Sequence, residues 1–330
     1  MEILHTPVLL EPCLKWLSPK NEPFENNAFL IDSTLGEGGH SSAFLSAYPN
    51  LHVLGIDIDK EIQSRAEKRL AVFGERMRFF NGWFDDFFAD YPAEFEKPDL
   101  ILFDLGISSF HYEKSGRGFS FRYDENLDMR LNCDEKKTAT DIINNMNEEE
   151  LSDLIFRYSE ERLSKKIARA VVEARSTGKI YSSKTLADII FRAVPAEYRY
   201  ARIHPATKTF QALRIAVNGE LKRLANALHN AFNVLNCGGK IGVITFHSLE
   251  DRIVKTYFKN LGKRCICPPE QAECTCGGKS CAEILTKKPV VPDEREIKSN
   301  SASRSAKLRV VRKLRNACEQ RFIKIGKEAV

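Results

Sequence analysis

A glycine-rich loop near the N-terminus, residues 32–40 with the sequence Asp-Ser-Thr-Leu-Gly-Glu-Gly-Gly-His, constrains the fold more than any other stretch. The apolar run Ala28–Ile31 before it predicts a buried strand, and we expect a helix to begin near His40. The glycines between them carry no side chain, so the backbone there can approach a ligand closely. The order strand, loop, helix therefore predicts a nucleotide-type cofactor site.

An acidic residue follows at the spacing that such a site requires. Leu51–Ile56 predicts a second strand, and Asp57 directly after it can accept hydrogen bonds from the hydroxyls of an adenosine ribose. Gly36, Gly38 and Gly39 lack the third glycine of the dinucleotide fingerprint, so a cofactor without a pyrophosphate fits better. S-adenosylmethionine is the common one. A glycine-rich turn beside a solvated aspartate is the alternative, which the order of elements disfavours.

Length and composition set broad limits. A chain of 330 residues with 43% hydrophobic content can bury one large core or two ordinary ones. No apolar run approaches the roughly 18 residues of a membrane span, and the first three residues, Met-Glu-Ile, lack the basic start of a signal peptide. We therefore expect a cytoplasmic protein that does not associate with membranes.

Positive charge is concentrated in two segments. Residues 157–214 hold thirteen Lys and Arg against five Asp and Glu, and residues 286–330 hold the same numbers, although the net charge is only +5. Because phosphate contacts with Lys and Arg supply most nonspecific nucleic-acid affinity, this distribution favours a polyanionic partner. Solvated helix faces are an equally open alternative.

Three further apolar runs, Met77–Asn81, Asp99–Leu105 and Lys240–Phe246, predict strands of a mostly parallel α/β sheet. The roughly 135 residues between the last two far exceed the length of a crossover connection. We therefore predict a helical insertion domain at residues 113–206, within a discontinuous domain of residues 1–112 and 207–330.

Helical apolar spacing supports this organisation. Asn147–Ser159 and Leu163–Arg175 predict helices inside the insertion, and Phe210–Leu235 predicts one long core helix that leads back to the sheet.

Asp104 ends a predicted strand, and in open α/β sheets ligands lie outside the carboxyl ends of the strands. It can therefore converge with Asp57 and the glycine loop, although a helix cap or turn acid is the alternative. The loop that follows interleaves cations with aromatic rings, a composition that stacks unpaired bases and grips phosphates. Packing between the domains is the other interpretation of these residues, Arg117, Phe119, Phe121, Arg122, Tyr123 and Arg130.

His247 follows another predicted strand and should face the same edge of the sheet. Ser248 and Asp251 have the spacing of a helix capping box, which leaves His247 and Glu250 open as substrate contacts.

Five of the nine cysteines lie close together near the C-terminus, as Cys265-x-Cys267, Cys274-x-Cys276 and Cys281. Zinc is possible, but structural zinc sites usually separate paired ligands by two to four residues, and a one-residue gap strains chelation. We therefore expect a reduced loop without metal. Disulfides are disfavoured in a cytosolic protein.

Taken together, the motifs resemble those of the RsmH (MraW) family, bacterial 16S rRNA cytosine-N4 methyltransferases, over nearly the whole chain. They are the loop at 32–41, His5–Leu10, Asp104–Ser109, Arg117–Phe121, Leu127–Arg130, His204–Gln211, Phe246–Arg252 and Arg304–Arg309.

The resemblance implies a class I S-adenosylmethionine-dependent methyltransferase fold, Rossmann-like with a helical insertion. It implies methylation of the N4 amine of cytosine 1402 in 16S rRNA of the small ribosomal subunit. By motif position it implies cofactor contacts from Gly38, Gly39, His40, Asp57, Phe84 and Asp104. His111 stands where family members often have Gln, and an imidazole cannot reproduce both amide hydrogen bonds.

We predict that Asp104, or a backbone carbonyl beside it, accepts a hydrogen bond from the cytosine amine. The base should be unpaired or flipped, because an amine inside a duplex is poorly placed for in-line attack. The insertion and the basic C-terminal segment are expected to hold the RNA. The predicted substrate contacts are Arg117, Phe119, Phe121, Arg130, His204 and His247.

Three rival functions remain open at this point: a DNA cytosine-amine methyltransferase, a ribosome-assembly factor that has lost catalysis, and a nicotinamide dehydrogenase. The incomplete dinucleotide fingerprint disfavours the last. The sequence leaves monomer and homodimer equally open.

Overall fold

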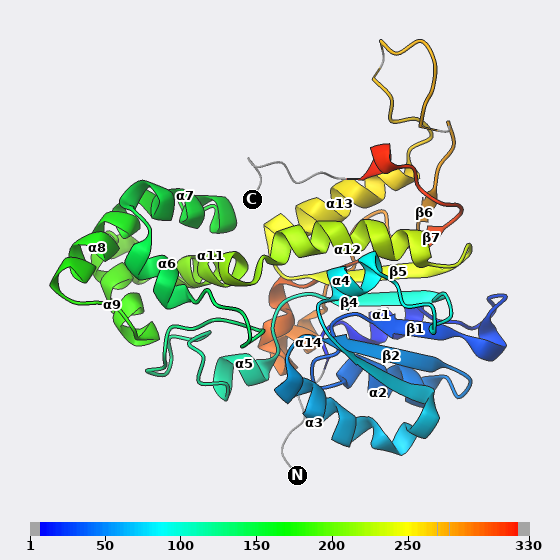
Figure 1. Ribbon diagram of the computed structural model, residues 1–330, viewed down its shortest axis with the longest axis horizontal. Coiled ribbons are helices and arrows are strands. Elements are labelled where there is room, and N and C mark those ends of the chain that lie inside the picture. The colour runs from blue at the N-terminus through cyan, green and yellow to red at the C-terminus, as the bar shows by residue number, and fades with distance from the viewer. Residues whose placement is uncertain (1–6, 269, 277, 323–330) are drawn as a thin grey trace. The chain divides into compact units, whose positions relative to one another are not determined.

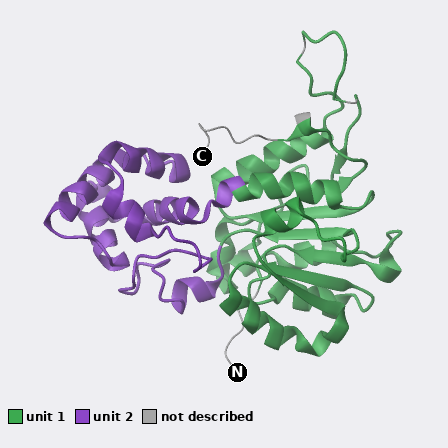
Figure 2. Ribbon diagram, viewed as in Figure 1, with its two compact units in different colours: residues 1–106, 223–324 green, residues 107–222, 325–330 purple. Residues whose placement is uncertain are grey.

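The computed structural model describes residues 7–268, 270–276 and 278–322 (Figure 1). The chain forms two compact units (Figure 2). The described part of the first unit comprises residues 7–106, 223–268, 270–276 and 278–322, and the described part of the second comprises residues 107–222. The second unit therefore extends beyond both ends of the segment that we expected to be inserted, residues 113–206.

The first unit is built on a seven-stranded sheet with the order β3-β2-β1-β4-β5-β7-β6. The first five strands of that order run parallel, whereas β7 is antiparallel to both of its neighbours. The strands are β1 Phe29–Asp32, β2 His52–Asp57, β3 Met77–Asn81, β4 Leu100–Asp104, β5 Lys240–Thr245, β6 Ala282–Ile284 and β7 Lys307–Lys313. The five predicted strands are confirmed, each within one residue at either end.

The strand order reverses between β1 and β4. The chain runs from β1 outward to β2 and β3, and then returns to place β4 and β5 on the other side of β1. In open α/β sheets this reversal opens a crevice beyond the carboxyl ends of the two central strands, where ligands bind.

Alternate residues along the strands enter two separate cores, one on each face of the sheet. Leu30 packs with α1 (Leu10–Trp16), α2 (Gly39–Ala47) and α3 (Lys60–Leu70). Ile31 packs on the opposite face, because successive side chains of a strand point to opposite sides. The helices of that second face are α4 (Phe84–Ala89), α12 (Glu220–Val234) and α13 (Ser248–Gly262). The short helix α14 is Glu294–Ser299.

The second unit is helical and has its own apolar core. Leu151 and Ile155 of α7 enter this core together with Ile167 of α8. Its helices are α5 Ser109–Glu113, α6 Ala139–Asn145, α7 Glu148–Ser159, α8 Ser164–Thr177, α9 Ser183–Ala193, α10 Ala196–Arg199 and α11 Ala206–Asn218. Among the described residues, no helix is long and apolar enough to cross a membrane.

The single helix predicted at Phe210–Leu235 is wrong. Gly219 adopts a φ of +63° and ends α11, and α12 begins at the next residue. A positive φ is easily reached by glycine and interrupts the helix. The apolar spacing of three and four continues across this break, so periodicity alone could not reveal it.

Candidate active site at the carboxyl ends of the strands

Two carboxylates end the two strands where the strand order reverses. Asp32 ends β1 and is 1% exposed. Its Oδ2 accepts a hydrogen bond from Ser41 Oγ at 2.6 Å, and its Oδ1 has no hydrogen-bond partner among the described residues. Burial raises the pKa of Asp32 to about 6. At the sequence level, Asp32 was treated only as the first residue of the glycine-rich loop. An acid at the end of a predicted strand could also have indicated a ligand-binding residue.

Asp104 ends β4 beside it in the sheet. Its backbone N–H donates to Thr34 Oγ1 at 2.7 Å, and its Oδ2 lies 3.5 Å from His40 Nδ1. Its other oxygen, Oδ1, is buried and has no hydrogen-bond partner within the part of the chain that the structure describes. Burial, followed by the nearby charges of Asp32 and Glu250, raises the pKa of Asp104 well above its ordinary value.

His40 connects this carboxylate to the N-terminal segment. Its Nε2 lies 3.0 Å from the carbonyl oxygen of Val8, which accepts the hydrogen bond, so Nδ1 of the neutral ring is an acceptor. Burial lowers the pKa of His40 to about 4. A hydrogen bond between Nδ1 and Asp104 then requires the proton to reside on the carboxyl group, which agrees with the raised pKa of Asp104.

The glycine loop is held by Asp57 at the end of β2. The N–H of Gly36 donates to Asp57 Oδ2 at 2.8 Å, and a Cβ placed on Gly36 would meet no atom within 4 Å. By contrast, a Cβ on Gly38 would lie 2.6 Å from Leu70 Cδ1, and one on Gly39 would lie 2.6 Å from Pro7 Cγ. Gly38 and Gly39 therefore leave room for protein side chains, and the cofactor contacts predicted for their backbone remain predictions.

Phe84, the other predicted cofactor contact of the first unit, begins α4. Its half-buried ring packs edge-on against Phe103 of β4, with the ring centroids 5.7 Å apart. It therefore lies over the same strand that ends in Asp104.

The predicted capping box of α13 is wrong by one residue. His247, not Ser248, is the N-cap: its Nδ1 accepts from the backbone N–H of Glu250 at 3.4 Å. Glu250 completes the box, since its Oε2 accepts from the backbone N–H of His247 at 3.3 Å. Asp251 instead binds the guanidinium of Arg309 at 2.7 Å. An imidazole nitrogen here replaces the hydroxyl that usually caps a helix.

The remaining predicted site residues lie in the second unit. Two of its cations, Arg117 and Arg130, stabilise the loop to which they belong. Arg117 donates to the carbonyl of Arg130 at 3.0 Å, and Arg130 pairs with Asp128 at 2.7 Å. Phe119 is 5% exposed and belongs to the core. His111 is also buried, with its ring centroid 5.2 Å from that of Phe119.

Phe121 and His204 form a second aromatic group in this unit. Their rings stack with centroids 4.5 Å apart and planes at 29°, and both are half-buried. Phe191 stacks on His204 with a centroid distance of 5.8 Å. The substrate and cofactor roles of all these residues remain predictions. His5 lies outside the described residues.

A family model described as the MraW methylase family matches residues 2–314. The chain belongs to this family. Ribosomal RNA small subunit methyltransferase H of Treponema denticola is 58% identical over 314 residues, which cover 95% of this chain and 98% of the relative. The protein of the same name from Treponema pallidum is 42% identical over 353 residues, with coverage of 94% and 93%. Among solved structures, an rRNA methylase from Streptococcus thermophilus is 10% identical with a TM-score of 0.39, covering 88% of this chain and 89% of its own.

This MraW-family chain has the class I methyltransferase fold, and S-adenosylmethionine is its methyl donor. The residues at the strand ends fit that molecule. Asp57 ends β2, where an acid can bind ribose hydroxyls. Three buried atoms without a hydrogen-bond partner in the described ranges, Asp32 Oδ1, Ser33 Oγ and Asp104 Oδ1, can accept from a polar ligand such as an amino acid moiety.

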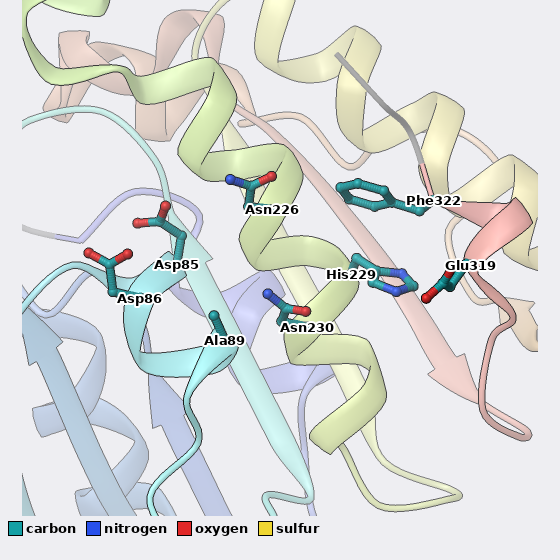
Figure 3. A pocket seen from close by; sticks show the side chains of 8 residues that line it. All are labelled: Asp85, Asp86, Ala89, Asn226, His229, Asn230, Glu319 and Phe322. Atoms are coloured by element: carbon teal, nitrogen blue, oxygen red, sulfur yellow. The ribbon is translucent and has the colours of Figure 1, made fainter. Parts of the chain in front are cut away.

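A separate pocket of this MraW-family protein lies between α4 and α12 (Figure 3). Asn226, His229 and Asn230 of α12 line it together with Asp85 and Asp86 of α4, as Figure 3 shows. None of the predicted cofactor residues lines this pocket. We therefore assign the methyl donor to the strand ends and not to this pocket.

Proposed function

We propose that this chain is a cytoplasmic enzyme that methylates the exocyclic N4 amine of a cytosine in 16S rRNA, cytosine 1402 as the resemblance implies. The small-subunit rRNA substrate is supported by the names of relatives that align with nearly the whole chain. The choice of an amine as acceptor is supported by one observation, the buried carboxyl of Asp104 at the donor site.

The residues of the first unit would bind and orient the donor, which supplies an electrophilic methyl group on a sulfonium when bound. Asp57 would hold the ribose hydroxyls, and the backbone at Gly36 leaves the space above it open. Oδ1 of Asp32 has no hydrogen-bond partner among the described residues, so it can accept a hydrogen bond from the bound methyl donor. Binding in a fixed geometry matters because well-aligned reactants react far faster than free ones.

In its ionised form, Asp104 would accept the proton of the attacking amine, and its Oδ1 has no hydrogen-bond partner among the described residues. A cytosine amine is a weak nucleophile because its lone pair is delocalised into the ring, so an acceptor for an amine hydrogen assists its attack. A carboxylate whose pKa is raised by burial binds a proton more strongly than an exposed aspartate does. His40 is a positioning residue in this scheme, because its neutral Nδ1 faces Asp104 Oδ2.

The second unit would supply the RNA-binding surface. Of the thirteen cations in residues 157–214, ten are exposed and none is buried. Exposed aromatic rings accompany them, with Tyr181 57% and Tyr200 84% exposed. Cations that contact phosphates and rings that stack on unpaired bases together favour single-stranded RNA.

Methyl transfer from labelled S-adenosylmethionine to small ribosomal subunits, naked 16S rRNA and DNA tests the proposal, with the modified base mapped. We expect one cytosine of the 16S rRNA to carry the methyl group on N4. Methylation of a ring carbon, or of DNA in preference to RNA, would contradict the proposed acceptor. Binding to the subunit without any donor binding would instead favour an assembly factor.

A further inference from the structure

Four cysteine sulfurs meet in the loop between α13 and β6, at residues 263–281. The Sγ atoms of Cys265, Cys267, Cys274 and Cys276 all lie within 4.8 Å of one another. The loop is drawn in orange in Figure 1 and extends away from the sheet of the first unit. It lies apart in sequence from every residue that we assign to the donor site, and methyl transfer makes no use of these thiols.

The sulfur separations match a tetrahedral metal site. Cys265 Sγ lies 3.7 Å from Cys274 Sγ, and Cys276 Sγ lies 3.5 Å from each of these two sulfurs. Four thiolates at a Zn–S distance of about 2.3 Å form a tetrahedron with edges of about 3.8 Å. A disulfide would require about 2.05 Å, so these three pairs are not bonded to each other. We propose that the four thiolates bind one zinc ion.

The one-residue gap within each Cys-x-Cys pair, which disfavoured zinc at the sequence level, does not prevent the arrangement. Cys274 and Cys276 bring their sulfurs to 3.5 Å despite the short gap. The other two ligands come from the opposite side of the loop, so the site depends on how the loop folds. Because all four ligands come from the protein, the coordination shell is closed and the ion is structural.

Neighbouring hydrogen-bond donors suit sulfurs that carry negative charge. The backbone N–H of Ile266 points to Cys276 Sγ at 3.4 Å, and Thr275 Oγ1 lies 3.8 Å from Cys267 Sγ. Groups that donate to ligand atoms orient them and balance their charge.

The loop also needs such a cross-link. Loops longer than about 12–15 residues without regular structure are uncommon, and a segment with little apolar surface cannot fold by burial. Arg321 closes the base of the loop, because its guanidinium donates to the carbonyls of Lys263 at 2.8 Å, Arg264 at 3.0 Å and Lys279 at 3.1 Å. Beyond that base, the thiol cluster joins Cys265 and Cys267 to Cys274 and Cys276, so metal binding would contribute directly to folding of the tip.

The test measures zinc and iron by mass spectrometry in the full-length, untagged protein. We expect one zinc per chain and no iron. The double variant Cys267→Ser, Cys276→Ser should lose the zinc, whereas the double variant Cys133→Ser, Cys237→Ser, which removes two exposed cysteines outside the loop, should retain it. Iron in place of zinc, or zinc retained by the loop variant, would overturn the proposal.

A second measurement on the unmodified protein covers the case in which the loop variant fails to fold. Addition of a strong chelator to the native protein should make four further thiols reactive toward a thiol reagent. In a separate sample with unmodified thiols, from which the chelator has been removed, added cobalt should produce a thiolate-to-metal charge-transfer band. Thiols that are fully reactive before chelation, with no metal bound, would overturn the site.

Discussion

The two basic segments of this chain have the same charge composition, but only the C-terminal one buries some of its cations. In residues 157–214, which belong to the second unit, every cation is exposed or half-buried. In the described part of residues 286–330, which belongs to the first unit, Arg309, Lys313 and Arg321 are buried. Arg309 pairs with Asp251, whereas Lys313 and Arg321 donate to backbone carbonyls.

The expectation that both segments hold RNA remains a prediction, but the two segments differ in how many of their cations are available. A cation whose donors are already used inside the fold stabilises that fold, whereas an exposed cation is available to a phosphate. The second unit therefore offers the stronger case for RNA binding. Substitutions of Lys313 and Lys165 test this comparison, and a substitution of Asp32 tests the buried carboxyl of the first unit.

Lys313→Ala should lower the free energy of unfolding by about 2–4 kcal/mol, because it removes the donor of one buried and one partly buried carbonyl. The Lys313 ammonium donates to the carbonyl of Leu235 at 2.7 Å and to that of Asn233 at 2.9 Å. Lys165→Ala, at an exposed position of the second unit, is the matched control and should change stability little. Denaturant unfolding measures both. Equal effects of the two substitutions would remove the distinction between the segments.

Asp32→Asn should change how stability depends on pH. Burial raises the pKa of Asp32 from 3.8 to about 6, so the folded state keeps a proton there that the unfolded state loses first. The stability that this bound proton contributes is fully present below about pH 4 and is lost as the pH rises through 6. The free energy of unfolding falls by up to about 3 kcal/mol over this range. The unfolding free energy of the wild type relative to the variant should therefore fall between pH 4 and 6. A constant difference would argue against a buried, proton-holding Asp32.

Lys165→Glu with Lys166→Glu should weaken binding to the small ribosomal subunit and make it less sensitive to salt. Each lost phosphate contact lowers the slope of log affinity against log salt by about 1. Lys287→Glu with Lys288→Glu changes two exposed cations of the other segment and serves as the control. If the control weakens binding equally, the C-terminal segment contacts RNA as well.

Much of the first unit could be predicted from sequence because its determinants are local. Short apolar runs predicted five strands, and the acid after β2 predicted Asp57 at the edge of the sheet. Glycine spacing indicated a cofactor loop, but it could not show that Gly38 and Gly39 face Leu70 and Pro7. That information depends on contacts between distant segments.

Other features depend on contacts between distant segments, which sequence patterns do not predict. Alternation along β7 carries the side chains of Arg309 and Lys313 inward, whereas composition counted them only as positive charge. The separation of Cys265 from Cys274 in sequence gave no measure of their separation in space. The cap at His247 was missed because imidazole is an uncommon capping group.

The central claim is that Asp104 accepts the proton of the attacking amine at the donor site. Single-turnover methyl transfer to small ribosomal subunits tests it most directly, measured across pH for the wild type and Asp104→Asn, with donor affinity measured alongside. We expect the wild-type rate to rise with pH as the raised pKa of Asp104 is passed. The variant should be about 10²–10⁴-fold slower and lose this dependence while still binding the donor. Full turnover by a variant with intact donor binding would contradict the account.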